Sequence, residues 1–97
     1  MRVSTTEFTV VGGGIAGLVA ARRLAMAGRT VRLIEASDHL GGTVASHLVG
    51  GINLDAGAES FATRSNTVAD LARELGLGDD IVSPSDEGAW LQPVDGA

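Results

Sequence analysis

The sequence predicts an α/β fold that begins with a Rossmann-like βαβ unit over residues 6–35, and three observations predict it. Phe8 to Val11 and Val31 to Ile34 are short apolar runs of the kind that forms β-strands, and Ile15 to Ala27, between them, has helical composition. A glycine loop, Gly12-x-Gly14-x-x-Gly17, joins the first strand to the helix. This order of strand, glycine loop, helix and strand is typical of a dinucleotide-binding unit.

The glycines of the loop each have a mechanical reason in such a unit. Gly12 lets the chain turn sharply, Gly14 carries no Cβ and lets a pyrophosphate approach the backbone, and Gly17 lets the helix lie close to the strands. The first helical turn leaves N–H groups unpaired, and the peptide dipoles favour an anion there. The residues of this loop expected to contact a cofactor are Gly12, Gly13, Gly14, Ile15, Ala16 and Gly17.

Glu35 ends the second predicted strand, where a carboxylate can accept hydrogen bonds from ribose hydroxyls. Its negative charge would repel a 2′-phosphate, so NADP is disfavoured. A glycine loop that only turns the chain is the alternative. The preceding strand, the following helix, the second strand and the terminal acid together favour cofactor binding.

Length and composition limit what the chain can contain. It has 97 residues, of which 44% are hydrophobic, so one domain or part of one is expected. A complete dinucleotide domain needs further strands, and a flavin or nicotinamide enzyme needs a region that holds its substrate. We therefore expect an incomplete domain.

Charge and residue types argue against several other classes. The net charge is −5, and Arg22-Arg23 is the largest basic cluster, so nucleic acid is not expected as a partner. The chain has no cysteine, and its two histidines, His39 and His47, have no partners at metal-ligand spacing, so no metal is expected. Phe8 to Ala21 imitates a secretory signal, but four glycines interrupt it, and a cytoplasmic protein is expected.

Residues 36–65 are predicted to form loops and one β-hairpin that contact the cofactor. The pair Gly41-Gly42 would bring more backbone close to a diphosphate. Thr43 to Leu48 and Ile52 to Leu54 flank Val49-Gly50-Gly51 and predict a hairpin with the two glycines as its turn.

The segment after the hairpin is dense in small residues around two acids. Asp55 and Glu59 could be considered as an acid–base pair, but nothing in the sequence shows that they converge. Solvated loop acids are the commoner case. A closely approached backbone at Gly57-Ala58 is the favoured interpretation.

Residues 66–97 are predicted to hold a helix and following strands. The helix spans Thr67 to Leu75, with its first residue as the N-cap and its apolar residues on one face. Gly76 is expected to end it in left-handed geometry. Ala89 to Leu91 is predicted as a strand and Pro93 to Gly96 as a turn.

Two groups of residues carry a family resemblance. One comprises Val10 to Gly17, Ala21, Gly28, Glu35 and Gly41-Gly42; the other comprises Leu54 to Arg64, followed by Leu71 to Leu77. The N-terminal group resembles the N-terminus of FAD-dependent amine-oxidase-like flavoproteins, a superfamily of monoamine oxidases, phytoene desaturases and porphyrinogen oxidases. The C-terminal group is similar to the bacterial protoporphyrinogen or coproporphyrinogen III oxidases of haem biosynthesis. The resemblance spans the whole chain.

The resemblance implies that FAD lies with its adenosine and diphosphate on the βαβ unit. By motif, the diphosphate would contact Gly12, Gly14 and Gly17, and the ribose would contact Glu35, with Ala36 beside it. The path toward the flavin would be lined by Gly41, Gly42 and Thr43. The isoalloxazine region would lie near Gly57, Ala58, Glu59 and Ser60. One departure is that His39 and Thr43 flank the glycine pair, where many superfamily members carry arginines.

The function implied is that of an FAD-dependent oxidoreductase acting on CH–CH groups. It would dehydrogenate protoporphyrinogen IX or coproporphyrinogen III with O2 as acceptor and hydrogen peroxide as product. Residues 1–97 would be the N-terminal part of its FAD-binding domain and inactive alone, because the later sequence supplies most of the flavin and porphyrin walls. The sequence identifies no catalytic residue, and peripheral membrane association is not readable from it.

Three alternatives stay open. One is another amine-oxidase-like flavoenzyme, acting on an amine or, in the phytoene desaturase type, on a carotenoid precursor. Another is a non-catalytic nucleotide-binding module, and the third is an NAD-binding half-domain.

Overall fold

The computed structural model describes residues 6–88 and 93–95 and divides the chain into two compact units, Met1–Ser60 and Phe61–Ala97. The strand predicted over Ala89 to Leu91 lies outside the described residues. Val94 and Asp95, within the predicted turn, do lie in a turn.

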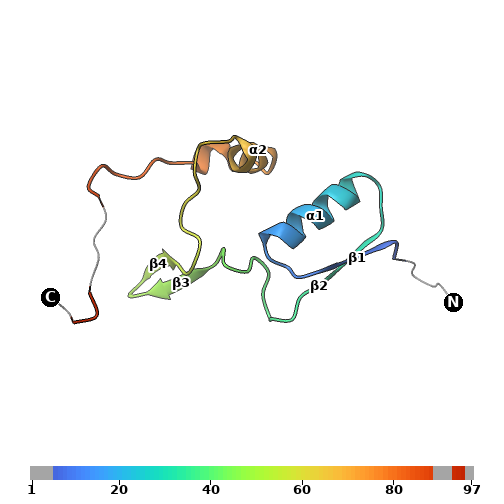
Figure 1. Ribbon diagram of the computed structural model, residues 1–97, viewed down its shortest axis with the longest axis horizontal. Coiled ribbons are helices and arrows are strands. Elements are labelled where there is room, and N and C mark those ends of the chain that lie inside the picture. Colours follow the sequence, from blue (N-terminus) through green and yellow to red (C-terminus); the bar gives the residue numbers. More distant parts are fainter. Residues whose placement is uncertain (1–5, 89–92, 96–97) are drawn as a thin grey trace. The chain divides into compact units, whose positions relative to one another are not determined.

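The first unit begins with the predicted βαβ arrangement (Figure 1). Strand β1 (Phe8–Val11) lies parallel to strand β2 (Val31–Ile34), and helix α1 (Ile15–Met26) connects them. The register pairs Val11 with Ile34, so the two strands end side by side. Because carboxyl ends of parallel strands meet at one edge, the glycine loop and the acid after β2 come together there. The α/β prediction for this part of the chain is confirmed.

Helix α1 ends at a glycine with left-handed backbone. Gly28 follows the cap residue Ala27 and has φ of +80°. Its N–H donates to the carbonyl of Ala25 at 3.0 Å, and the N–H of Arg29 donates to the carbonyl of Leu24 at 3.0 Å. These two bonds form a Schellman motif, which stops the helix and turns the chain toward β2.

A β-hairpin follows in the same unit. Strand β3 (Ser46–Val49) pairs antiparallel with strand β4 (Ile52–Asp55). Gly50 and Gly51 connect them with φ of +57° and +81°, as a two-residue type I′ turn requires. The hairpin and its glycine turn are therefore confirmed.

The first hairpin strand has other bounds than the predicted Thr43 to Leu48. The two-residue turn sets Val49 directly opposite Ile52, so Val49 belongs to the strand. Thr43 to Ala45 precede the strand, although the carbonyl of Ala45 still accepts a hydrogen bond from Ala56 N–H at 2.9 Å.

The second unit contains helix α2 (Thr67–Glu74) and a short 3₁₀ helix, η1 (Gly78–Asp80). The prediction that Thr67 caps α2 is wrong, because the N-cap is Asn66 and makes no side-chain cap bond. The hydroxyl of Thr67 instead accepts a hydrogen bond from Ser65 Oγ at 3.3 Å.

Helix α2 ends at Glu74, one residue before the predicted Leu75, and the left-handed glycine predicted to end it is present. Gly76 has φ of +77°, and its N–H donates to the carbonyl of Arg73 at 3.1 Å. The N–H of Leu77 donates to the carbonyl of Ala72 at 2.8 Å, which completes another Schellman motif.

The described part of the chain encloses no buried hydrophobic side chain. Val11 at the end of β1 is 81% exposed and Ile34 at the end of β2 is 44% exposed. Parallel strands in complete domains are covered on both faces, so these residues belong to an incomplete domain, as expected. No helix within residues 6–88 and 93–95 combines the length and apolarity that crossing a membrane requires.

Candidate dinucleotide site

Backbone conformation and packing within the chain require two of the three glycines of the Gly12-x-Gly14-x-x-Gly17 loop, Gly12 and Gly17. Gly12 has φ of +101°, a left-handed conformation that a side chain would strain. Its N–H donates to the carbonyl of Ile34 at 2.7 Å, which fixes the start of the loop on β2. A Cβ on Gly17 would overlap the carbonyl of Gly12 and lie 3.4 Å from the side chain of Val10. The first turn of α1 therefore rests directly on the loop and on β1.

Gly14 differs from both. Its φ of −73° and ψ of −176° are ordinary extended backbone that any residue adopts. A Cβ there would meet only the Cα of Gly42, at 4.0 Å, which is ordinary van der Waals contact. Neither backbone conformation nor internal packing explains a glycine at this position, so the space beside it is available to a ligand.

The amides of the first turn of α1 face this space without competing groups. Gly14 makes no side-chain cap bond, and the first turn contains no acidic residue. Leu18 N–H donates to the carbonyl of Gly14 at 2.9 Å, whereas no acceptor for the N–H groups of Ala16 and Gly17 lies within the described residues. Free amides at the positive end of a helix dipole favour an anion such as a diphosphate.

Glu35 joins the end of β2 to the glycine loop. Its Oε1 accepts a hydrogen bond from Gly13 N–H at 2.8 Å, and its Oε2 accepts one from Ser37 N–H at 2.7 Å. These contacts, that of Ser37 first, lower the pKa of Glu35 from 4.5 to about 2. The carboxylate is therefore ionised and fixed in orientation, and each oxygen keeps a lone pair for a further donor.

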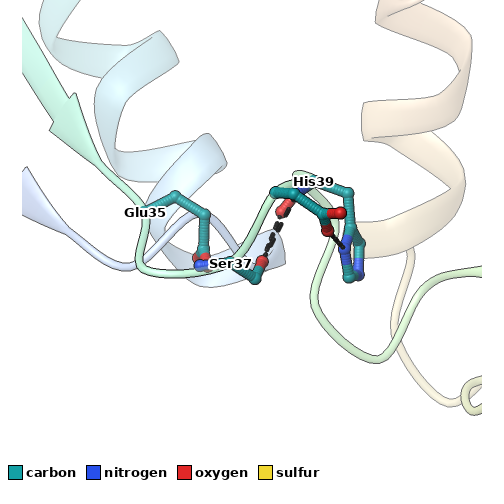
Figure 2. A network of polar contacts seen from close by, with 4 residues as sticks. Glu35, Ser37 and His39 are labelled. Carbon is teal, nitrogen blue, oxygen red and sulfur yellow. Dashed lines mark hydrogen bonds and ion pairs between the residues drawn. The ribbon is translucent and has the colours of Figure 1, made fainter.

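A small polar network joins Glu35, Ser37 and His39 (Figure 2). Ser37 Oγ donates to the carbonyl of His39 at 2.9 Å, and His39 Nδ1 lies 3.0 Å from Asp38 Oδ1. The hydrogen bond with His39 also lowers the pKa of Asp38. Ser37 lowers the pKa of Glu35 first through its backbone N–H and second through its side chain. The sequence did not indicate the first of these contacts, because every residue type except proline carries a backbone N–H.

The glycine pair lies against the glycine loop. Gly41 N–H donates to the carbonyl of Gly13 at 2.8 Å, and an isolated parallel bridge joins Gly41 to Gly14. A Cβ on Gly42 would lie 3.1 Å from the Cα of Gly14, a tighter contact than a Cβ usually makes, so the glycine at position 42 favours this close approach of the two backbones. The structure thus brings together two predicted contact segments that are more than twenty residues apart in sequence.

A third predicted segment is joined to the glycine pair's own segment. Ala58 N–H donates to the carbonyl of Thr43 at 2.8 Å. A Cβ on Gly57 would overlap that same carbonyl oxygen, so the close backbone approach expected here is present. Glu59 and Ser60 follow and are exposed. Within the described residues no hydrogen bond joins Glu59 to Asp55, the other acid considered.

Three further predicted site residues lie near the glycine loop and Glu35 in the sequence. Ile15 and Ala16 form the start of α1, and Ala36 is exposed between Glu35 and Ser37. Within residues 6–88 and 93–95, no three His, Asp or Glu side chains gather as a metal site would require.

Comparison with known proteins gives consistent matches. Residues 15–93 match the family described as flavin containing amine oxidoreductase. The coproporphyrinogen III oxidase of Mycobacterium bovis is 44% identical over 76 residues, which cover 75% of this chain and 17% of that protein. The putrescine oxidase of Kocuria rosea is 44% identical over 71 residues, which cover 73% of this chain and 15% of that protein.

A solved structure matches the fold. The crystal structure of an Exiguobacterium sp. 255-15 protein, described as a protoporphyrinogen oxidase, has a TM-score of 0.70 and 35% identity to this chain. The match covers 80% of this chain and 18% of that one. The chain thus spans less than a fifth of the length of each of these relatives.

Proposed function

This chain belongs to the flavin-containing amine oxidoreductase family, and we propose that it is the FAD-binding N-terminal part of an oxidase that dehydrogenates a porphyrinogen. A flavin cofactor follows from the family; FAD in particular is our proposal. The observation that carries it is Gly14, which the chain's own geometry does not require to be glycine. A diphosphate resting on the first turn of α1 does require it, because a Cβ would occupy the space of the approaching phosphate.

The residues of the site divide the binding of FAD between them. The N–H groups of Ala16 and Gly17 would donate to the diphosphate, and the α1 dipole would add attraction for its charge. The free lone pairs of the Glu35 carboxylate would accept hydrogen bonds from the ribose hydroxyls. The same negative charge disfavours a 2′-phosphate and so argues against NADP.

The flavin half of the cofactor would extend past the glycine pair. Gly41, Gly42 and Thr43 would line its path, and Gly57 to Ser60 would lie nearer the isoalloxazine. When bound, FAD supplies the redox chemistry, accepting hydride equivalents from the substrate and passing electrons to O2 with hydrogen peroxide as product. The residues of this chain hold and orient the cofactor; the walls that position a substrate belong to regions outside it.

The substrate of the oxidase could be a porphyrinogen or an amine, and the relatives include enzymes of both kinds. The coproporphyrinogen III oxidase of Mycobacterium bovis and the putrescine oxidase of Kocuria rosea share the same 44% identity with this chain. The stretch Glu59-Ser60-Phe61 resembles the porphyrinogen oxidases, and one of the matched solved structures is also described as one. Structures of a putrescine oxidase match with TM-scores of 0.68 and 0.70, so the preference rests on this stretch. A porphyrinogen of haem biosynthesis is therefore favoured, and an amine is the alternative that the putrescine oxidase supports.

The test is to express the protein from its full reading frame and measure bound flavin by absorbance. Peroxide release is then followed with coproporphyrinogen III, protoporphyrinogen IX and putrescine. The proposal expects bound FAD and peroxide with a porphyrinogen but not with putrescine. Turnover of putrescine but of neither porphyrinogen would favour the amine oxidase alternative. Turnover of any substrate by residues 1–97 without the rest of the protein would refute the proposal that this chain is only a part of the oxidase.

A further inference from the structure

Two segments of the proposed flavin path are held together by one hairpin ladder. The type I′ turn at Gly50-Gly51 sets the register in which Ser46 faces Asp55. The hydrogen bonds from Ala56 to Ala45 and from Ala58 to Thr43 continue this register without a shift. The ladder therefore reaches from a turn at one end to the predicted cofactor segments at the other.

The continuation of the hairpin register beyond Ser46 and Asp55 requires a glycine at position 57. Gly57 corresponds to Val44 in the same register, next to the bonded pair of Thr43 and Ala58. A Cβ on Gly57 would overlap the carbonyl oxygen of Thr43 and lie 3.2 Å from its carbonyl carbon. Both are backbone atoms, so the clash is removed only if one of the two chain segments moves away.

The other end of the Thr43 segment is fixed on the glycine loop. Gly41 bridges to Gly14, and its N–H donates to the carbonyl of Gly13 at 2.8 Å. A displacement at Thr43 or Ala58 would therefore change where Ala58 and the following residues lie relative to the diphosphate cradle. The cradle itself, built from the glycine loop and Glu35, has its own hydrogen bonds and does not use the hairpin.

We propose that Gly57 is a positioning residue, and that the β3–β4 hairpin is the device that sets residues 58–60 against Gly42 and Thr43 to form one flavin-contacting edge. This inference rests on the proposed binding of FAD. It implies that the adenosine and flavin halves of the cofactor are held by separable parts of the first unit. Damage to the hairpin should weaken FAD binding while leaving the adenosine half of the site intact.

The experiment compares two ligands in the protein expressed from its full reading frame. Flavin fluorescence gives the affinity for FAD in cofactor-stripped protein, and calorimetry gives the affinity for ADP, which lacks the flavin half. We expect Gly57→Ala to weaken FAD binding roughly tenfold and to change ADP binding less than about twofold. The visible circular dichroism of bound FAD should change in the same variant.

Two further variants keep the test independent of local misfolding at Gly57. Gly51→Val strains the turn at the far end of the hairpin, where φ is +81°, and should weaken FAD binding roughly threefold with ADP binding kept. Gly50→Asn is the control, because asparagine suits the first position of a type I′ turn and a Cβ there meets no atom within 4 Å.

Unchanged FAD affinity in both Gly57→Ala and Gly51→Val would overturn the inference while leaving the proposed function standing. Equal loss of FAD and ADP in both variants would also overturn it, because the hairpin would then support the whole unit. Failure of the unaltered protein to bind FAD would refute the proposed function itself.

Discussion

The carboxylate of Glu35 accepts a hydrogen bond at 2.8 Å from the N–H of Gly13, which lies 22 residues earlier in the chain. Gly13 is buried, and the bond ties the end of β2 to the loop after β1. Glu35 therefore shapes the diphosphate cradle in addition to offering oxygens to a ribose. One side chain serves two parts of the same proposed ligand.

Glu35→Gln should weaken FAD binding roughly tenfold. The amide keeps one oxygen, so it can accept from only one of the two N–H groups, those of Gly13 and Ser37, that the carboxylate now satisfies. Fluorescence titration of cofactor-stripped protein measures the change. Glu87→Gln, the same substitution at an exposed glutamate of the second unit, is the control and should bind FAD normally.

The acid titration of Glu35 should be displaced to low pH. Its pKa of about 2 in the folded chain lies below the ordinary 4.5, so its contribution to stability is complete above pH 4.5. That contribution is lost as the pH falls from 4.5 toward about 2. Carboxyl chemical shifts followed by NMR give the midpoint directly, and a midpoint near 4.5 would contradict the two hydrogen bonds.

Gly17→Ala should destabilise the first unit by about 1–3 kcal/mol and abolish nucleotide binding. The added Cβ overlaps the carbonyl of Gly12, so α1 must move away from the loop. Chemical denaturation and ADP titration measure the two effects. Gly28→Asn provides the comparison, since its φ of +80° suits asparagine and a Cβ there meets nothing within 4 Å; it should retain both properties.

Gly76→Ala should weaken the end of α2 by about 1–2 kcal/mol. A Cβ at this position meets no atom, so the cost arises from the left-handed φ of +77° alone. Hydrogen exchange at Leu77 N–H, which donates to Ala72, measures the loss of the Schellman motif. Gly76→Asn should recover part of the protection, and equal exchange in all three proteins would argue against the motif.

Local sequence rules predicted a helix end, a turn or a strand well where a residue type has a single structural use at that position. Apolar runs located β1 and β2, and left-handed glycines located the hairpin turn and the end of α2. The N-cap of α2 was misplaced by one residue, because Asn66 and Thr67 are both good capping residues and the sequence does not say which precedes the helical backbone.

Contacts made by backbone N–H groups were not predictable in the same way. The bond from Ser37 N–H to Glu35 and the bond from Ala58 N–H to Thr43 involve donors that every residue except proline carries. The bond from Ala58 to Thr43 leaves one trace in the sequence, which is the glycine at position 57, where a Cβ would overlap the carbonyl oxygen of Thr43. That Thr43 is the partner is known only from the fold.

In the proposed function the space beside Gly14 is kept for the diphosphate of FAD, and Gly14→Ala tests this most directly. The backbone at Gly14 is ordinary, and a Cβ would lie 4.0 Å from the Cα of Gly42, so the free energy of unfolding should change by less than about 1 kcal/mol. The affinity for FAD, measured by flavin fluorescence in the same preparation, should fall at least roughly tenfold. A Gly14→Ala protein that is equally stable and binds FAD as tightly as the unaltered protein would contradict the account.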